Sequence, residues 1–193
     1  MQKQIHMKSC GKKLCEEYMG KHPVISISLK GINAASYEAA FELTVKTIKG
    51  AVEKAGFLKM SDKLDEDEKK EYRAILDENM SEATLFWSLK NLSELLEKHY
   101  ETKVILLIDE YDVPLAKAFE NGYYDKMVFL IRNLLEQTLK TNNSLKFAVM
   151  TGCMRISKES IFTGLNNLKV LSITDEHFDE YFGFTDEDVL SLI

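Results

Sequence analysis

Two adjacent carboxylates, Asp109 and Glu110, directly follow five consecutive apolar residues, Val104 to Ile108. A short, wholly apolar run that is rich in β-branched residues is typical of a strand buried on both faces of a parallel sheet. Ligands of open α/β sheets bind outside the carboxyl ends of the strands, which is where these two acids would emerge. The sequence therefore predicts that Asp109 and Glu110 border a ligand-binding cleft.

The two acids match the Walker B pattern of nucleoside-triphosphate hydrolases. In that pattern the first acid, here Asp109, holds the Mg²⁺ of the bound nucleotide, and the second, here Glu110, polarises the attacking water. The alternative is an acidic pair that only solvates the end of a strand, as in many α/β proteins. Support for the first interpretation must come from other residues suited to contact phosphate.

The apolar strand candidate at 146–151 supplies such residues. It ends in Thr151 and Gly152, and Arg155 follows four residues after Thr151. In P-loop enzymes of the additional-strand group, the strand beside Walker B ends in a polar sensor that contacts the γ-phosphate or the attacking water. A hydroxyl at the strand tip, a glycine that permits close approach and a nearby arginine suit that role. The alternative is that Thr151 merely ends a strand and Arg155 caps or pairs locally.

The elements that would position these residues alternate between strand and helix patterns. Ser36 and Ser81 can each cap an amphipathic helix, and the stretch 127–135 describes another helix face. The heavily charged stretch 57–80 predicts a solvated helical insertion. Strands are predicted at 24–29, 104–108, 146–151 and, more weakly, 169–173. This alternation predicts an α/β fold with a mainly parallel sheet in a single domain over residues 1–193.

Composition and charge exclude several broad classes of protein. The 193 residues fit one domain with a sizeable core, and the net charge of −6 gives no global reason to bind nucleic acid. No apolar stretch approaches the ~20 residues needed to cross a bilayer, and the N-terminus is no signal peptide. Cys10, Cys15 and Cys153 have no metal-ligand spacing, which predicts reduced thiols in a cytoplasmic protein.

Several motifs carry a resemblance to a known family. They are I-D-E-Y-D-V-P-L at 108–115, N-G-Y-Y at 121–124, T-G-C-M-R-I-S-K-E-S-I-F-T-G-L-N-N at 151–167 and Y-F-G-F-T at 181–185. With them, the chain from about Cys15 onward resembles the predicted AAA-ATPase-like family of bacteria, whose members are P-loop ATPases with a three-layer fold. The resemblance implies ATP and Mg²⁺ as cofactors. It also implies the residue roles: Asp109 as the metal-associated acid, Glu110 as catalytic base, Thr151 with Gly152 at the sensor position, and Arg155 on the phosphate side.

The chain departs from this family at the phosphate-binding loop. That loop, GxxxxGK[ST] after a strand, supplies backbone N–H groups, a lysine and a hydroxyl ligand for Mg²⁺. The nearest match, Gly11-Lys12-Lys13, lacks the first glycine, the terminal Ser or Thr, and a preceding strand. The expectation is therefore a fragment: a P-loop NTPase-like core that lacks its first strand and is inactive as written.

The family resemblance also predicts strand order and burial. The strands at 24–29, 104–108 and 146–151 should lie side by side, with 104–108 in the middle, and the missing strand should belong between 146–151 and 169–173. The residues of 104–108 and 147–150 should be nearly inaccessible. Many family members carry a C-terminal PD-(D/E)XK nuclease-like domain, absent here, through which alone nucleic acid would be contacted.

Two other functions stay open. One is a regulatory or interaction module that keeps a degenerate NTPase fold without turnover. The other is a Mg²⁺-dependent phosphodiesterase with Asp109, Glu110 and Asp112 as metal ligands and Lys30 in the same cleft, although the chain is expected to turn at Asp112. Self-association also stays open, because AAA-type proteins often form rings. ATP is the expected small-molecule partner, and no membrane partner is expected.

Overall fold

The protein is an α/β fold built on three parallel strands. The structure, a computed structural model, describes residues 11–153, 168–172 and 189–190. Its strands are β1 (Val24–Ser28), β2 (Val104–Asp109) and β3 (Leu145–Met150), in the order β1-β2-β3. β2 pairs in parallel with both neighbours, with Val24 opposite Ile105 and Ile108 opposite Met150. The predicted strand order, with 104–108 in the middle, is confirmed.

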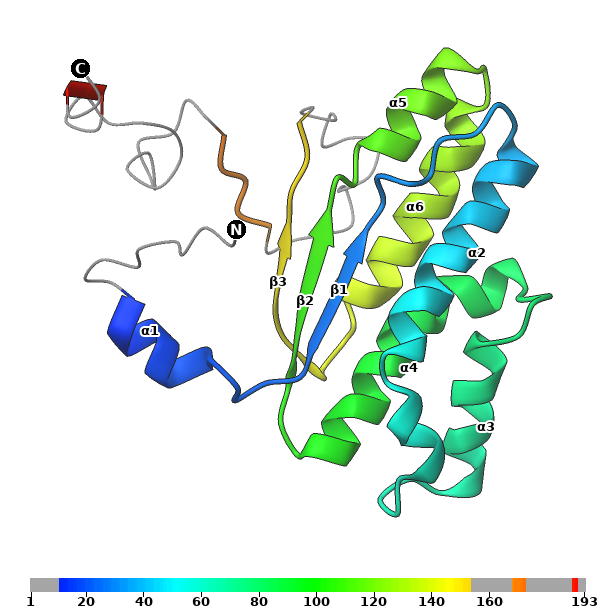
Figure 1. The fold of residues 1–193 in the computed structure, drawn as a ribbon. Helices are drawn as coiled ribbons and strands as arrows, with labels where there is room; N and C mark the ends of the chain where they lie inside the picture. The colour runs from blue at the N-terminus through cyan, green and yellow to red at the C-terminus, as the bar shows by residue number, and fades with distance from the viewer. Residues whose placement is uncertain (1–10, 154–167, 173–188, 191–193) are drawn as a thin grey trace.

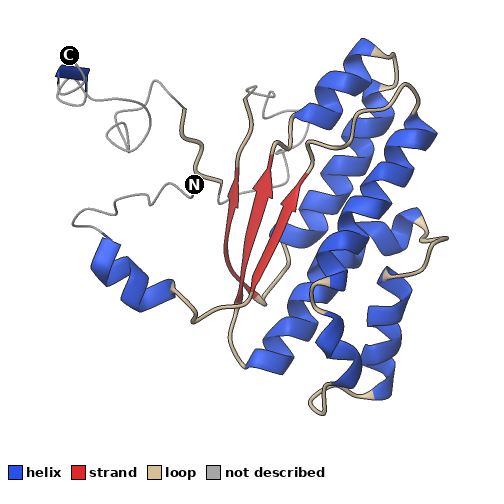
Figure 2. Ribbon diagram, viewed as in Figure 1, coloured by secondary structure: helices blue, strands red, loops and turns tan. Residues whose placement is uncertain are grey.

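Figure 2 shows where the helices lie, and two of them begin at a serine that caps the helix. Ser36 accepts a hydrogen bond from the Ala39 N–H at 3.3 Å, and Ser81 accepts one from the Thr84 N–H at 3.1 Å, as predicted. The helical elements are α1 (Gly11–Tyr18), α2 (Tyr37–Glu53), η1 (Gly56–Met60, a 3₁₀-helix), α3 (Glu66–Ile75), α4 (Glu82–Tyr100), α5 (Val113–Glu120) and α6 (Tyr124–Leu139).

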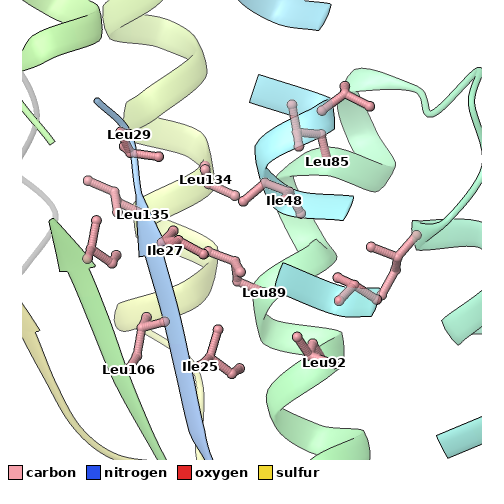
Figure 3. Close-up of a cluster of buried hydrophobic side chains, with 14 of the residues drawn as sticks. Ile25, Ile27, Leu29, Ile48, Leu85, Leu89, Leu92, Leu106, Leu134 and Leu135 are labelled. Atoms are coloured by element: carbon pink, nitrogen blue, oxygen red, sulfur yellow. The ribbon is translucent and has the colours of Figure 1, made fainter. Parts of the chain in front are cut away.

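One face of the sheet carries the hydrophobic core. The helices α2, α4 and α6 lie over this face (Figure 1), and their leucines and isoleucines meet alternate residues of the strands. Figure 3 shows the centre of this cluster, where Ile25, Ile27 and Leu106 of the sheet lie beside Ile48, Leu89 and Leu134 of the helices. The pleat of a strand sends successive side chains to opposite faces, so every second strand residue enters this core.

The opposite face of the sheet is much more open than predicted. Leu107, Phe147 and Val149 are 37%, 39% and 46% exposed, so the expectation that 104–108 and 147–150 are nearly inaccessible is wrong for them. Among the described elements, α1 approaches this face, where the Tyr18 ring packs edge-on against Phe147 with 5.7 Å between ring centroids. The arrangement is compatible with the predicted sandwich.

The charged stretch predicted as an insertion at 57–80 is largely helical. It contains η1 and α3, and α3 begins with a capping box in which Asp65 and Glu68 bond each other's backbone N–H groups. Tyr72 is fully buried and its hydroxyl donates to the Val52 carbonyl at 2.9 Å. The thin apolar stripe therefore anchors α3, which packs against α4.

Residues 169–172 do not form the weak fourth strand that was predicted at 169–173, and residue 173 lies outside the described residues. Within the described ranges β3 pairs with β2 alone, so β3 is an edge strand of the described sheet. The described helices include none that is long and apolar enough to cross a membrane.

Candidate functional site

The ends of β2 and β3 bring together two residues predicted from the sequence. The Thr151 N–H continues the ladder by donating to the Ile108 carbonyl at 2.9 Å. This places the Thr151 hydroxyl beside β2, where it donates a hydrogen bond to Asp109 Oδ1. The residue proposed as metal ligand and the residue proposed as sensor thus lie in direct contact, across neighbouring strands that are joined by parallel pairing.

Glu110 occupies a bulge immediately beyond β2. In a regular parallel ladder, the N–H of residue 110 would donate to the Thr151 carbonyl; instead the Tyr111 N–H does so, at 3.2 Å. Glu110 is the extra residue, and it has a left-handed conformation with φ of 54°. Such a conformation costs a residue with a Cβ about 1–2 kcal/mol. Bulges next to functional sites commonly redirect a side chain.

The bulge turns Glu110 toward the chain that follows β1. Its Oε1 lies 3.8 Å from Lys30 Nζ, and the Glu110 side chain is 27% exposed while that of Lys30 is 77% exposed. The Leu29 N–H, next to Lys30, donates to the Asp109 carbonyl at 2.9 Å. The carboxyl ends of all three strands therefore meet at this site, and Lys30 lies beside Glu110 as the phosphodiesterase hypothesis required.

Asp112 contributes to the site in a way that the sequence did not predict. Asp112 is 3% exposed, and its Oδ2 accepts a hydrogen bond from the Cys153 N–H at 3.0 Å. Burial, with a smaller contribution from the charge of Asp112, raises the pKa of the neighbouring Tyr111. The contact joins residues 41 positions apart, and no local spacing in the sequence marks it.

Gly152 does permit a close approach, but the neighbours are protein atoms. A Cβ at this position would lie 2.7 Å from Asp112 Oδ1 and 2.9 Å from Tyr111 Cε1, so no larger residue fits without a shift. The sequence had assigned this glycine to the approach of a phosphate. Its role as a residue that binds nucleotide stays a prediction, and Arg155, the other proposed phosphate contact, lies outside the described residues.

The donor set suits a hard divalent cation that also binds substrate. Mg²⁺ in nucleotide sites is commonly held by one or two carboxylates together with substrate phosphates, and Asp109 with the Thr151 hydroxyl would fit that pattern. Residues 11–153, 168–172 and 189–190 contain no group of three or more His, Cys, Asp or Glu side chains that could hold a metal by themselves. Asp109, Glu110 and Asp112 thus do not form the metal-ligand cluster that the phosphodiesterase hypothesis needs.

The predicted cleft at Asp109 and Glu110 stays a prediction. Two surface hollows in the described part of the chain border Tyr37 and Glu82, on α2 and at the start of α4, and neither is lined by Asp109, Glu110 or Thr151. The hydrogen-bonded carboxylate and hydroxyl at the strand ends lie where α/β sheets bind ligands, which makes the strand ends the candidate site.

Comparison with known proteins shows the family of this chain. The model of the family described as "Predicted AAA-ATPase" matches residues 5–162. A protein of Azotobacter chroococcum mcd 1, described as "Uncharacterized protein in vnfD 5'region", is 31% identical over 96 residues, which are 45% of this chain and 17% of that relative. No solved structure matches the chain. Since the family model covers most of the sequence, the chain belongs to the predicted AAA-ATPase family.

Proposed function

We propose that this chain is part of an ATP-hydrolysing domain whose chemistry takes place at the ends of β1, β2 and β3. The observation that carries the proposal is the hydrogen bond from the Thr151 hydroxyl to the Asp109 carboxylate, at the strand ends where α/β sheets bind ligands. Membership of the predicted AAA-ATPase family supports ATP as the nucleotide. Asp109 would hold Mg²⁺, Glu110 would act as general base, and Thr151 would contact the γ-phosphate or the attacking water.

The three residues are suited to separate steps of phosphoryl transfer. Mg²⁺, when bound, would neutralise charge on the phosphate oxygens. The Thr151 hydroxyl can rotate from Asp109 to donate to a phosphate oxygen. Glu110 lies at the same strand ends, 3.8 Å from Lys30 Nζ and only partly buried, and its carboxylate could accept a proton from water there.

Residues 1–193 by themselves are expected to show little turnover. Catalysis of phosphoryl transfer depends on positioning and charge stabilisation, and the sequence contains no GxxxxGK[ST] loop to hold the β- and γ-phosphates. Two carboxylates without that loop would repel a polyphosphate. A form that includes a P-loop should bind ATP and hydrolyse it.

The test compares ATP–Mg²⁺ binding by calorimetry with steady-state phosphate release. It uses residues 1–193, the product extended by any P-loop encoded upstream of Met1, and Glu110→Gln in the extended product. We expect binding and turnover by the extended product, and retained binding with lost turnover for Glu110→Gln. Robust turnover by residues 1–193, lost on Glu110→Gln, would show that the phosphates are held elsewhere. Failure of the extended product to bind ATP would favour the non-catalytic module.

A further inference from the structure

We infer that Asp112 is a positioning residue that fastens the loop after β3 to the end of β2 and so keeps Thr151 against Asp109. The structural part of this inference stands on the contacts of Asp112 alone. Its consequence for catalysis rests on the proposed ATPase function. Neither the Walker B pattern nor the sensor pattern includes a carboxylate at this position.

The Asp112 carboxylate takes the place of a backbone carbonyl in the strand ladder. Beyond the bulge, the Tyr111 N–H donates to the Thr151 carbonyl, so a regular parallel ladder would continue with the Cys153 N–H donating to the Tyr111 carbonyl. That N–H donates instead to Asp112 Oδ2 at 3.0 Å. The side chain thereby extends the pairing of β2 with the loop after β3, at the point where the main chain turns into α5.

Burial shows that this bond matters to the local structure. Asp112 is only 3% exposed, and burial of a carboxylate is costly unless hydrogen bonds offset it, as the bond of Oδ2 with the Cys153 N–H does. A backbone N–H that donates to a charged oxygen makes a stronger bond than one to a neutral oxygen. Gly152 adds a steric argument, because a Cβ there would lie 2.7 Å from Asp112 Oδ1. The loop therefore lies directly on the carboxylate.

The position of Asp112 suggests another role, as the N-cap of α5, but its contacts argue against it. Asp112 is the residue before Val113, yet its side chain makes no capping hydrogen bond to α5. Asp65, by contrast, holds the same position before α3 and accepts from the Glu68 N–H at 2.9 Å. Asp65 is therefore a matched control: an aspartate at a helix start, remote from the strand ends.

Amide hydrogen exchange on residues 1–193 tests the structural inference without ATP. In Asp112→Ala, the Cys153 N–H loses its acceptor and should exchange about tenfold faster, with the Thr151 N–H following, because one lost hydrogen bond corresponds to that factor. Asp112→Asn keeps an oxygen acceptor and should restore most of the protection. Asp65→Ala should leave both amides unchanged. Equal exchange of Cys153 in wild type and Asp112→Ala would overturn the inference.

A double-mutant cycle tests whether Asp112 and Gly152 act on each other. Gly152→Ala should also speed exchange at Cys153, because its new methyl group pushes the loop off the carboxylate. Combined with Asp112→Ala, it should add less than it does alone, since the bond is already lost and only the contact with Tyr111 Cε1 at 2.9 Å remains. Full additivity of the two effects would contradict a direct contact.

Turnover by a form that hydrolyses ATP tests the catalytic consequence separately. Asp112→Ala should lower kcat with little change in the KM for ATP, Asp112→Asn should recover most of kcat, and Asp65→Ala should change neither. A rise in KM alone, or equal losses in Asp112→Ala and Asp65→Ala, would contradict positioning. If no form turns over, the proposed function fails, and the exchange data alone decide whether Asp112 holds the loop.

Discussion

Two glutamates at opposite ends of β2 share an uncommon backbone conformation for different reasons. Glu101, with φ of 57°, lies just before the strand and ends α4, and its N–H donates to the Glu97 carbonyl at 2.7 Å. Left-handed residues are common at the end of a helix. Glu110, with φ of 54°, follows the strand where no helix ends. Glu110 lies instead in the bulge beyond β2, and backbone strain of this kind is frequent at functional sites, which supports the catalytic role proposed for Glu110.

Removal of the carboxylate charge from each glutamate should produce the largest difference between them, and the difference should be in turnover. In a form that hydrolyses ATP, Glu110→Gln should lower turnover by about 10²–10⁴-fold, the usual contribution of a general base. Glu101→Gln should leave turnover unchanged, because this side chain is 76% exposed and pairs only with Lys63 among the contacts that the structure describes. Phosphate release at saturating ATP measures both. Equal losses in the two variants would remove the functional distinction.

Replacement by glycine should reveal the strain that both positions share. Glycine adopts positive φ without the steric cost of a Cβ, so Glu110→Gly and Glu101→Gly should each raise the melting temperature by about 1–4 °C. Thermal unfolding followed by circular dichroism measures this. Glu110→Gly should gain stability and lose turnover, whereas Glu101→Gly should gain stability only. A fall in melting temperature in Glu110→Gly would show that its carboxylate stabilises the fold by more than the strain costs.

The titration of the Glu101 carboxyl should show a smaller effect, which comes from its pairing with Lys63. The hydrogen bond and charge of Lys63, 2.7 Å away, lower the pKa of the Glu101 carboxyl. The pKa of Glu101 is therefore lower in the folded than in the unfolded protein. The pair stabilises the fold at pH values above the unfolded-state pKa, and this stabilisation is lost as the pH falls through the lowered folded-state pKa. In Lys63→Met, an NMR titration should find the Glu101 pKa returned toward its ordinary value. An unchanged titration curve would show that the pair does not persist in solution.

Removal of Lys30 should have the smallest effect on stability. Its ammonium is 3.8 Å from Glu110 and the side chain is 77% exposed, and exposed ion pairs of this kind contribute about 0–1 kcal/mol. Lys30→Met should therefore unfold within about 0.5 kcal/mol of wild type in urea. A much larger loss would mean that the pair, and not the bulge, holds Glu110 in place.

The sequence predicted those features that depend on local pattern. The apolar run before Asp109 gave the middle strand, and Ser36 and Ser81 gave two helix starts, because a strand core and a capping hydroxyl each leave a local mark. The parallel pairing of neighbouring strands was predicted too, and the contact of Thr151 with Asp109, which was not itself predicted, results from it.

Other features depend on distant parts of the chain and could not be predicted in this way. Leu107 and Phe147 belong to apolar runs that are typical of burial on both faces, but their exposure depends on which helices cover the sheet. The bulge at Glu110 has no sequence signal, since glutamate rarely adopts positive φ. The bond between Asp112 and Cys153 depends on the register of two strands, which neither residue specifies alone.

The order in which the strands follow one another also has a consequence for how the domain folds. β2 reaches β3 through α5 and α6 only, whereas β1 pairs with β2 across α2, η1, α3 and α4. Closing a longer stretch of chain costs more entropy and slows the formation of the contacts at its ends. We therefore expect β2, α5, α6 and β3 to assemble first. Asp109 and Thr151 would then meet early in folding, and Lys30 would reach Glu110 only when β1 docks.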